Sequence, residues 1–205
     1  MSLEKLIVIV EEPSAERALD ILLPRLLGLV EHQLVTFRCK QELLRELPKR
    51  LRAYSRYLPD TWKIVVLLDR DRDDCIKLKA DLDAIAVKAG LTTKSSSATF
   101  QVINRIAIEE LEAWYFGDWE AVRVAYPRVS EDWNKKSGFR NPDEIAGGTW
   151  ERLERILKQY GYFQGGLRKV ELAASVAAHM NPDRNSSPSF QAFVQGVRAA
   201  LGQTA

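Results

Sequence analysis

The stretch VVLLDRDRDD (Val65–Asp74) decides the fold, because an unbroken apolar run ends in a dense group of charged residues. Such a run is typical of a strand covered on both faces of a parallel sheet. Asp69, Asp71 and Asp73 then follow the strand at its carboxyl end, where open parallel sheets bind their ligands. Two interpretations are open: a metal site, or caps for the next helix to which Asp74 also contributes.

Three further apolar runs, at residues 5–10, 34–39 and 99–107, resemble strands, and helical patterns separate the runs. Pro13 and Gly28 mark the start and end of the first helix, and Pro48 is expected to interrupt or kink the second. A helix is expected over residues 108–116. The alternation predicts an α/β fold with a mostly parallel sheet of about four strands flanked by helices.

The amino-acid composition of the chain changes after about Tyr126. Residues 127–148 are rich in Gly, Pro, Asn and charge, and helical patterns follow at residues 149–161, 168–180 and 187–201. We expect residues 1–125 to form the α/β core. Residues 126–205 are expected to form an irregular segment and a helical tail packed on that core, giving a single compact unit.

Composition limits the possible functions. The net charge of +2 over 205 residues does not by itself demand nucleic acid or a membrane, so such partners must be argued from local patches. Two cysteines and two histidines form no zinc, disulfide or catalytic-triad pattern. The apolar run at residues 6–10 is too short for a signal peptide or a membrane span. We therefore expect a cytoplasmic protein with no membrane partner; the oligomeric state is left open.

Acids also follow the first strand, where Glu11 and Glu12 come directly after Val10. If the first and third strands are neighbours, Glu11 faces Asp69 and Asp71 across the same edge of the sheet. Clustered carboxylates raise one another's pKa unless a cation neutralises them, and oxygen ligands at this density favour Mg²⁺ or Mn²⁺.

Four segments together resemble a known family: VEEPSAERAL (residues 10–19), VVLLDRDRDD, IAIEELEAWYFGD (residues 106–118) and the tail that ends near Leu201. A glutamate after the first strand with Asp-x-Asp after a later one resembles the TOPRIM domain of topoisomerases, primases and overcoming-lysogenization-defect (OLD) nucleases. In order and extent the four segments resemble the TOPRIM-like domain-of-unknown-function family 4276.

The resemblance implies a Mg²⁺-dependent (or Mn²⁺-dependent) centre that acts on nucleic-acid phosphodiesters. Catalytic roles carry over to Glu11, Asp69 and Asp71, which would also hold the metal. Asp73 and Glu112 are further candidate metal ligands; Glu112 stands on the helix after the fourth strand, and its alternative role is in an exposed acidic stripe.

This chain departs from the family pattern at Glu12, where glycine is usual, and at Ala15, where a second acid is usual. Two functions therefore remain open. One is a nuclease or related phosphodiester-acting enzyme; the other is a catalytically degenerate module that binds nucleic acid or a partner ATPase. The resemblance implies a role in defence against mobile elements or phage.

Cationic residues are the candidates for nucleic-acid contact. One group lies in LPKRLRAYSRYL with tyrosines between its members, a combination that can neutralise phosphates and stack bases. Such a stretch is more often a solvated helix face whose tyrosines border the core. Others follow the fourth strand or lie in the irregular segment. The candidates are Lys49, Arg50, Arg52, Arg56, Arg105, Lys135 and Lys136.

Overall fold

A four-stranded parallel sheet forms the centre of the computed structural model, which describes residues 2–203. The strands are β1 (Lys5–Val10), β2 (Glu31–Thr36), β3 (Trp62–Asp69) and β4 (Val102–Ala107). Their order is β2-β1-β3-β4, with every neighbouring pair parallel. The predicted α/β fold is therefore confirmed. The second strand begins three residues before its apolar run, because its partly exposed edge position does not require a continuous apolar stretch.

Helices connect and flank the strands. Their bounds are α1 (Pro13–Leu27), α2 (Lys40–Tyr54), α3 (Cys75–Lys88), α4 (Glu112–Gly117), α5 (Trp119–Ala125), α6 (Thr149–Gln159), α7 (Lys169–Ala177) and α8 (Pro188–Ala200). The expected interruption at Pro48 is wrong, because α2 continues through it. The helix expected from residue 108 begins only at Glu112, since Glu109 has a φ of 62°.

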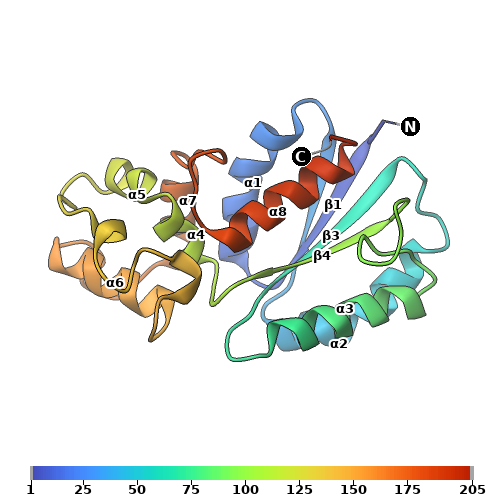
Figure 1. The fold of residues 1–205 in the computed structure, drawn as a ribbon, viewed down its shortest axis with the longest axis horizontal. Coiled ribbons are helices and arrows are strands. Elements are labelled where there is room, and N and C mark those ends of the chain that lie inside the picture. Colours follow the sequence, from blue (N-terminus) through green and yellow to red (C-terminus); the bar gives the residue numbers. More distant parts are fainter. Residues whose placement is uncertain (1, 204–205) are drawn as a thin grey trace.

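Two apolar layers cover the sheet (Figure 1), with α1 and α8 on one face and α2 and α3 on the other. Within β1, Leu6 and Val8 face the first layer, whereas Ile7 and Ile9 face the second. Since successive strand residues point to opposite faces, burial of both faces explains the unbroken apolar runs in the sequence.

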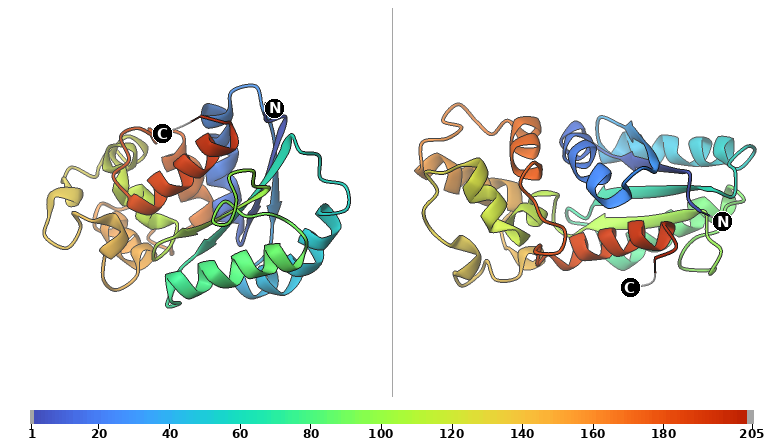
Figure 2. Two further views of the ribbon diagram at one scale, coloured as in Figure 1. Left: turned by 45° about the vertical axis from the view of Figure 1, so that its right-hand side comes forward. Right: turned by 90° about the horizontal axis from the view of Figure 1, so that it is seen from above.

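The C-terminal helices contact the sheet and also extend beyond it. α7 packs against α1, and α8 lies against β4. Figure 2 shows α5 and α6 beyond one end of the sheet, the end where β4 leads into α4. This arrangement places helical residues over the carboxyl edge of the strands.

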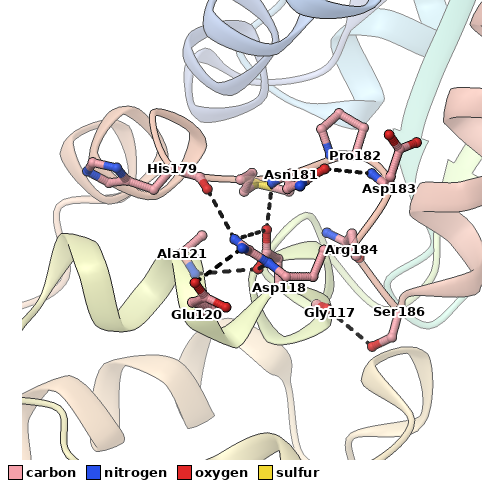
Figure 3. Close-up of polar contacts among 12 residues, drawn as sticks. Gly117, Asp118, Glu120, Ala121, His179, Asn181, Pro182, Asp183, Arg184 and Ser186 are labelled. Atoms are coloured by element: carbon pink, nitrogen blue, oxygen red, sulfur yellow. Dashed lines mark hydrogen bonds and ion pairs between the residues drawn. The ribbon is translucent and has the colours of Figure 1, made fainter.

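A buried carboxylate joins the start of α5 to the segment between α7 and α8 (Figure 3). Asp118 caps α5 by accepting a hydrogen bond from the backbone N–H of Ala121. It also accepts from the backbone N–H of Asn181 at 2.6 Å and from Nε of Arg184 at 2.7 Å. These contacts fix the C-terminal segment to the α4–α5 junction.

None of the helices between residues 2 and 203 combines the length and the apolar character needed to cross a bilayer.

Candidate metal centre

The carboxyl edges of β1 and β3 bring two acids together. The strands are direct neighbours, with Val10 of β1 opposite Leu67 of β3. Glu11, the next residue after β1, is 8% exposed, and Asp69, the last residue of β3, is 7% exposed. The first and third strands are therefore neighbours, which is the condition under which Glu11 faces Asp69.

A third acid reaches the same place from α4. Glu112 is the first residue of this helix and is 1% exposed. Its charge is one of those that raise the pKa of Asp69, as are the charges of Glu11 and Asp71. The structure thus gathers Glu11, Asp69 and Glu112 at one buried edge.

Burial dominates the proton affinity of these acids. It holds the pKa of Asp69 well above its ordinary range, with Glu11 as the next cause. Burial, followed by the Asp71 carboxylate, raises the pKa of Glu11 to about 7 against the opposing charge of Lys40. Burial likewise raises the pKa of Glu112 to about 7. Such clustering of perturbed acids is typical of functional sites.

Several polar atoms at this edge have no hydrogen-bond partner within residues 2–203. They are Oε2 of Glu11, Oε2 of Glu112 and the hydroxyl of Tyr115, all buried. An unpartnered buried oxygen costs about 1–3 kcal/mol, and more when it is charged. The site is therefore incomplete without a proton, a cation or another donor.

Two lysines that the sequence interpretation missed partly offset the acids. Lys169, the first residue of α7, lies 3.9 Å from carboxylate oxygens of both Glu12 and Glu112. Burial by itself lowers the pKa of Lys169, but Glu112 and Glu12 outweigh it and raise the pKa above its ordinary value. The only sequence signal was the position of this lysine at a helix start.

The second lysine, Lys40, is the first residue of α2 and is 7% exposed. It forms ion pairs with Asp71 at 3.0 Å and Asp73 at 2.8 Å. Burial lowers the pKa of Lys40, but hydrogen bonds to Asp73 and Asp71 outweigh burial and raise it. Asp71 and Asp73 are half-exposed, and the helix cap is Asp74, which accepts from the backbone N–H of Lys77 at 2.8 Å.

A divalent cation fits the donor chemistry of this edge. Its oxygens are hard ligands, and two of them are buried without partners. Within the described part of the chain, however, no three His, Cys, Asp or Glu side chains form a ready-made metal-binding group. Glu11 and Glu112 are close enough to Asp69 to raise its pKa. The three side chains are nevertheless not already gathered around a common point.

The two departures from the family pattern have distinct surroundings. Glu12 accepts a short hydrogen bond from Ser14 and faces Lys169, so its charge is partly compensated. Ala15 is buried and brings no carboxylate. Glu16 lines a separate pocket of about 430 Å³ with Arg17 and therefore does not replace the missing acid.

Within residues 2–203, none of the cationic candidates forms an ion pair with Glu11, Asp69 or Glu112. The guanidinium of Arg105 already donates hydrogen bonds to backbone carbonyls: its Nε donates to the carbonyl of Ala192 in α8 at 2.7 Å. Lys135 and Lys136 pair with Asp132 and Glu131 on the surface. The remaining four are exposed along the second half of α2 and just after it: Lys49, Arg50, Arg52 and Arg56.

Comparisons with known proteins agree with the fold. The C-terminal region of the Burkholderia pseudomallei OLD protein is similar over 98% of this chain and 100% of its own, with a TM-score of 0.53 and 14% identity. The C-terminal region of the Xanthomonas campestris pv. campestris OLD protein covers 96% of this chain and 95% of its own, with a TM-score of 0.50 and 12% identity. At these identities the likeness concerns the fold alone.

No curated protein sequence matches this chain. The sequence pattern of one family, described as "Domain of unknown function (DUF4276)", matches residues 10–198. That range includes both acidic strand ends, α4 and nearly all of α8. The chain therefore belongs to the DUF4276 family, as its four segments indicated.

Proposed function

We propose that this protein is a Mg²⁺-dependent or Mn²⁺-dependent, TOPRIM-type nuclease that acts on nucleic-acid phosphodiesters. The observation that carries the proposal is the group of buried acids Glu11, Asp69 and Glu112, in which two carboxylate oxygens have no partner within residues 2–203. A buried acidic group whose charge is only partly compensated is costly to stability, so its presence favours a functional role.

Asp69, Glu11 and Glu112 would hold the ion, and Asp71 would contribute from the rim. When bound, the ion would polarise the phosphodiester and stabilise charge on its oxygens. Glu11 has a further capacity, because a carboxyl with a pKa of about 7 holds or releases a proton near neutral pH. Its unpartnered Oε2 is the atom at which that proton would be held.

Nucleic acid would be held by exposed cations. Lys49, Arg52 and Arg56 form no ion pair with an acid in the described residues, so their charge is available to phosphates. Lys49 lies about 14 Å along α2 from Lys40, at 1.5 Å per residue. A nucleic-acid strand bound at the acidic edge would therefore be able to extend along α2.

A second function has its own support. Ala15 brings no acid, and Lys40 and Lys169 already offset part of the negative charge. These features favour a catalytically degenerate module. Such a module would bind nucleic acid or a partner ATPase in the cytoplasm, in defence against mobile elements or phage. The ATPase and the defence role rest on the family resemblance alone.

Cleavage of labelled single- and double-stranded DNA and RNA, with Mg²⁺ or Mn²⁺, separates the two functions. The nuclease proposal expects metal-dependent cleavage that Glu11→Gln and Asp69→Asn each reduce by at least about 100-fold, the scale of a lost general base or ligand. Asp60→Asn, an exposed acid outside the site, is the matched control. Binding without cleavage of any substrate would favour the degenerate module.

A further inference from the structure

The ammonium of Lys40 lies in a cage of oxygen atoms. Its Nζ donates to the backbone carbonyl of Asp69 at 2.6 Å and to that of Arg70 at 3.0 Å. It also contacts Oδ2 of Asp71 at 3.0 Å and Oδ2 of Asp73 at 2.8 Å. Lysine is almost never fully buried unless it is paired, so burial to 7% exposure requires these contacts.

The cage has the composition of a cation site. Two carboxylate oxygens and two backbone carbonyl oxygens are the ligand types that divalent cations such as Ca²⁺ and Mg²⁺ take in proteins. An ammonium has only three protons, so the four oxygens exceed the hydrogen bonds that it can donate singly. The contacts are thus those of a central cation surrounded by oxygens.

The cage also holds an unusual backbone. Asp71 has a φ of 52°, a left-handed conformation that non-glycine residues rarely adopt. Its N–H donates to the carbonyl of Glu109 at 2.9 Å, and its carboxylate is held by Lys40. Lys40 therefore joins α2 to the loop that carries Asp71 and, through Asp69, to the end of β3.

We propose that Lys40 is a positioning residue whose ammonium takes the place of a second divalent cation. It binds Oδ2 of Asp71 and Oδ2 of Asp73. Glu11, Asp69 and Glu112, with the other carboxylate oxygen of Asp71 at the rim, are left to one exchangeable ion. The part that concerns the exchangeable ion rests on the proposed function; the occupancy of the cage by Lys40 does not. Asp73, a candidate metal ligand, is accordingly a ligand of the lysine.

Counting bound Mn²⁺ by electron paramagnetic resonance tests the proposal. Lys40→Ala empties the cage, and the number of Mn²⁺ ions bound per chain is expected to rise by about one, because the four oxygens remain. Adding Asp73→Asn to Lys40→Ala is expected to abolish the gain. Lys63→Ala, a partly buried lysine at the other end of β3 that donates to the Asp60 carbonyl, should leave the count unchanged.

A folded Lys40→Ala variant that binds no more Mn²⁺ than the wild type would overturn the proposal. The proposed function fails in a different way. In that case the Asp69→Asn variant would bind as many Mn²⁺ ions as the wild type. The gain in Lys40→Ala can occur in either case, so the two failures are distinguishable.

Nuclear magnetic resonance provides a test that does not depend on folding of the alanine variant. A buried, hydrogen-bonded ammonium exchanges its protons slowly, so wild-type protein labelled with ¹⁵N at lysine should show an NH₃⁺ signal for Lys40. The signal is assigned by its loss in Lys40→Arg, and it should shift in Asp73→Asn. Absence of a slowly exchanging Lys40 signal, or its insensitivity to Asp73→Asn, would contradict the oxygen cage.

Discussion

Burial and the neighbouring carboxylate of Glu11 hold the pKa of Asp69 well above its ordinary range. The two residues are brought together because β1 and β3 are adjacent and parallel, so that their carboxyl ends meet at one edge. Two acids that disfavour each other's ionisation store free energy that a proton or a cation can release. Metal binding, proton exchange and stability at this edge are therefore linked.

Glu112→Gln should stabilise the protein at high pH. The pKa of Glu112 is about 7 in the folded state against an ordinary 4.5. Between these values the folded state retains a proton that the unfolded state has lost, so stability falls as pH rises from about 4.5 to 7. The penalty is absent below 4.5 and complete above 7, where it is on the order of 3 kcal/mol.

Urea unfolding at pH 5 and pH 8, with chelator present, measures the difference between Glu112→Gln and the wild type. The exposed Glu144→Gln is the control and should change stability equally, and little, at both pH values. A Glu112→Gln effect that is the same at pH 5 and pH 8 would show that this carboxyl ionises normally.

Magnesium should stabilise the folded protein, and more strongly at pH 8 than at pH 5, because protons compete for the same carboxylates. At a concentration 100 times the dissociation constant the gain is about 2.7 kcal/mol, which thermal melting detects as a higher Tm. Asp69→Asn should remove the gain, and NaCl at equal ionic strength should not reproduce it. A Tm that Mg²⁺ raises equally in wild type and Asp69→Asn would place the bound ion elsewhere.

The sequence was sufficient for the strands and for the acids that end them. An apolar run that stops at Asp69 is a local signal, as is the run that stops before Glu11. The pairing of the two acids depended on the first and third strands being neighbours, and the TOPRIM resemblance supported it. The start of α4 was missed because a helical pattern cannot reveal that Glu109 has a positive φ and that its carboxylate pairs with Arg70.

The positions of Lys169 and Lys40 beside the acids could not be predicted from the sequence for another reason. Lys169 is separated from Glu12 by more than 150 positions, and only the packing of α7 against α1 brings them together. Lys40 had one usable signal, since the helix after β2 begins at the same edge of a parallel sheet as Asp69. That signal needs the strand order, in which β2 and β3 flank β1.

Asp118→Ala should destabilise the fold by about 3 kcal/mol, because it leaves the backbone N–H of Asn181 without its acceptor and removes the buried carboxylate that Nε of Arg184 binds (Figure 3). Urea unfolding measures the loss. Asp183→Ala, an exposed acid two residues from Asn181 that pairs with Arg198, should cost less than about 1 kcal/mol. An equal loss of unfolding free energy in the two variants would show that the Asp118 contacts do not anchor the C-terminal segment.

Arg52→Ala and Arg56→Ala should weaken binding to duplex DNA and reduce its dependence on salt. Each phosphate contact contributes about 0.9 to the slope of log affinity against log salt concentration, so the double variant should lower the slope by up to about 1.8. Fluorescence anisotropy measures this slope between about 50 and about 200 mM NaCl, a range that includes the physiological ionic strength of about 150 mM. The control is Arg198→Ala on α8, which lies on the other face of the sheet. If Arg198→Ala lowers DNA affinity and the salt slope equally, the DNA is not bound specifically by the arginines of the α2 region.

Residues 1–125 should not fold alone, because the C-terminal helices complete the core. α8 lies against β4, and its Phe190, Phe193 and Val197 are fully buried in the layer that also contains Val8 of β1. Without them one face of the sheet would be exposed to water, at a cost of about 1.5–3 kcal/mol for each large apolar side chain. Circular dichroism should show no cooperative melting for the fragment, whereas the full chain should melt in one cooperative transition. A sharp transition in the fragment would instead identify residues 126–205 as an appendage on an independent domain.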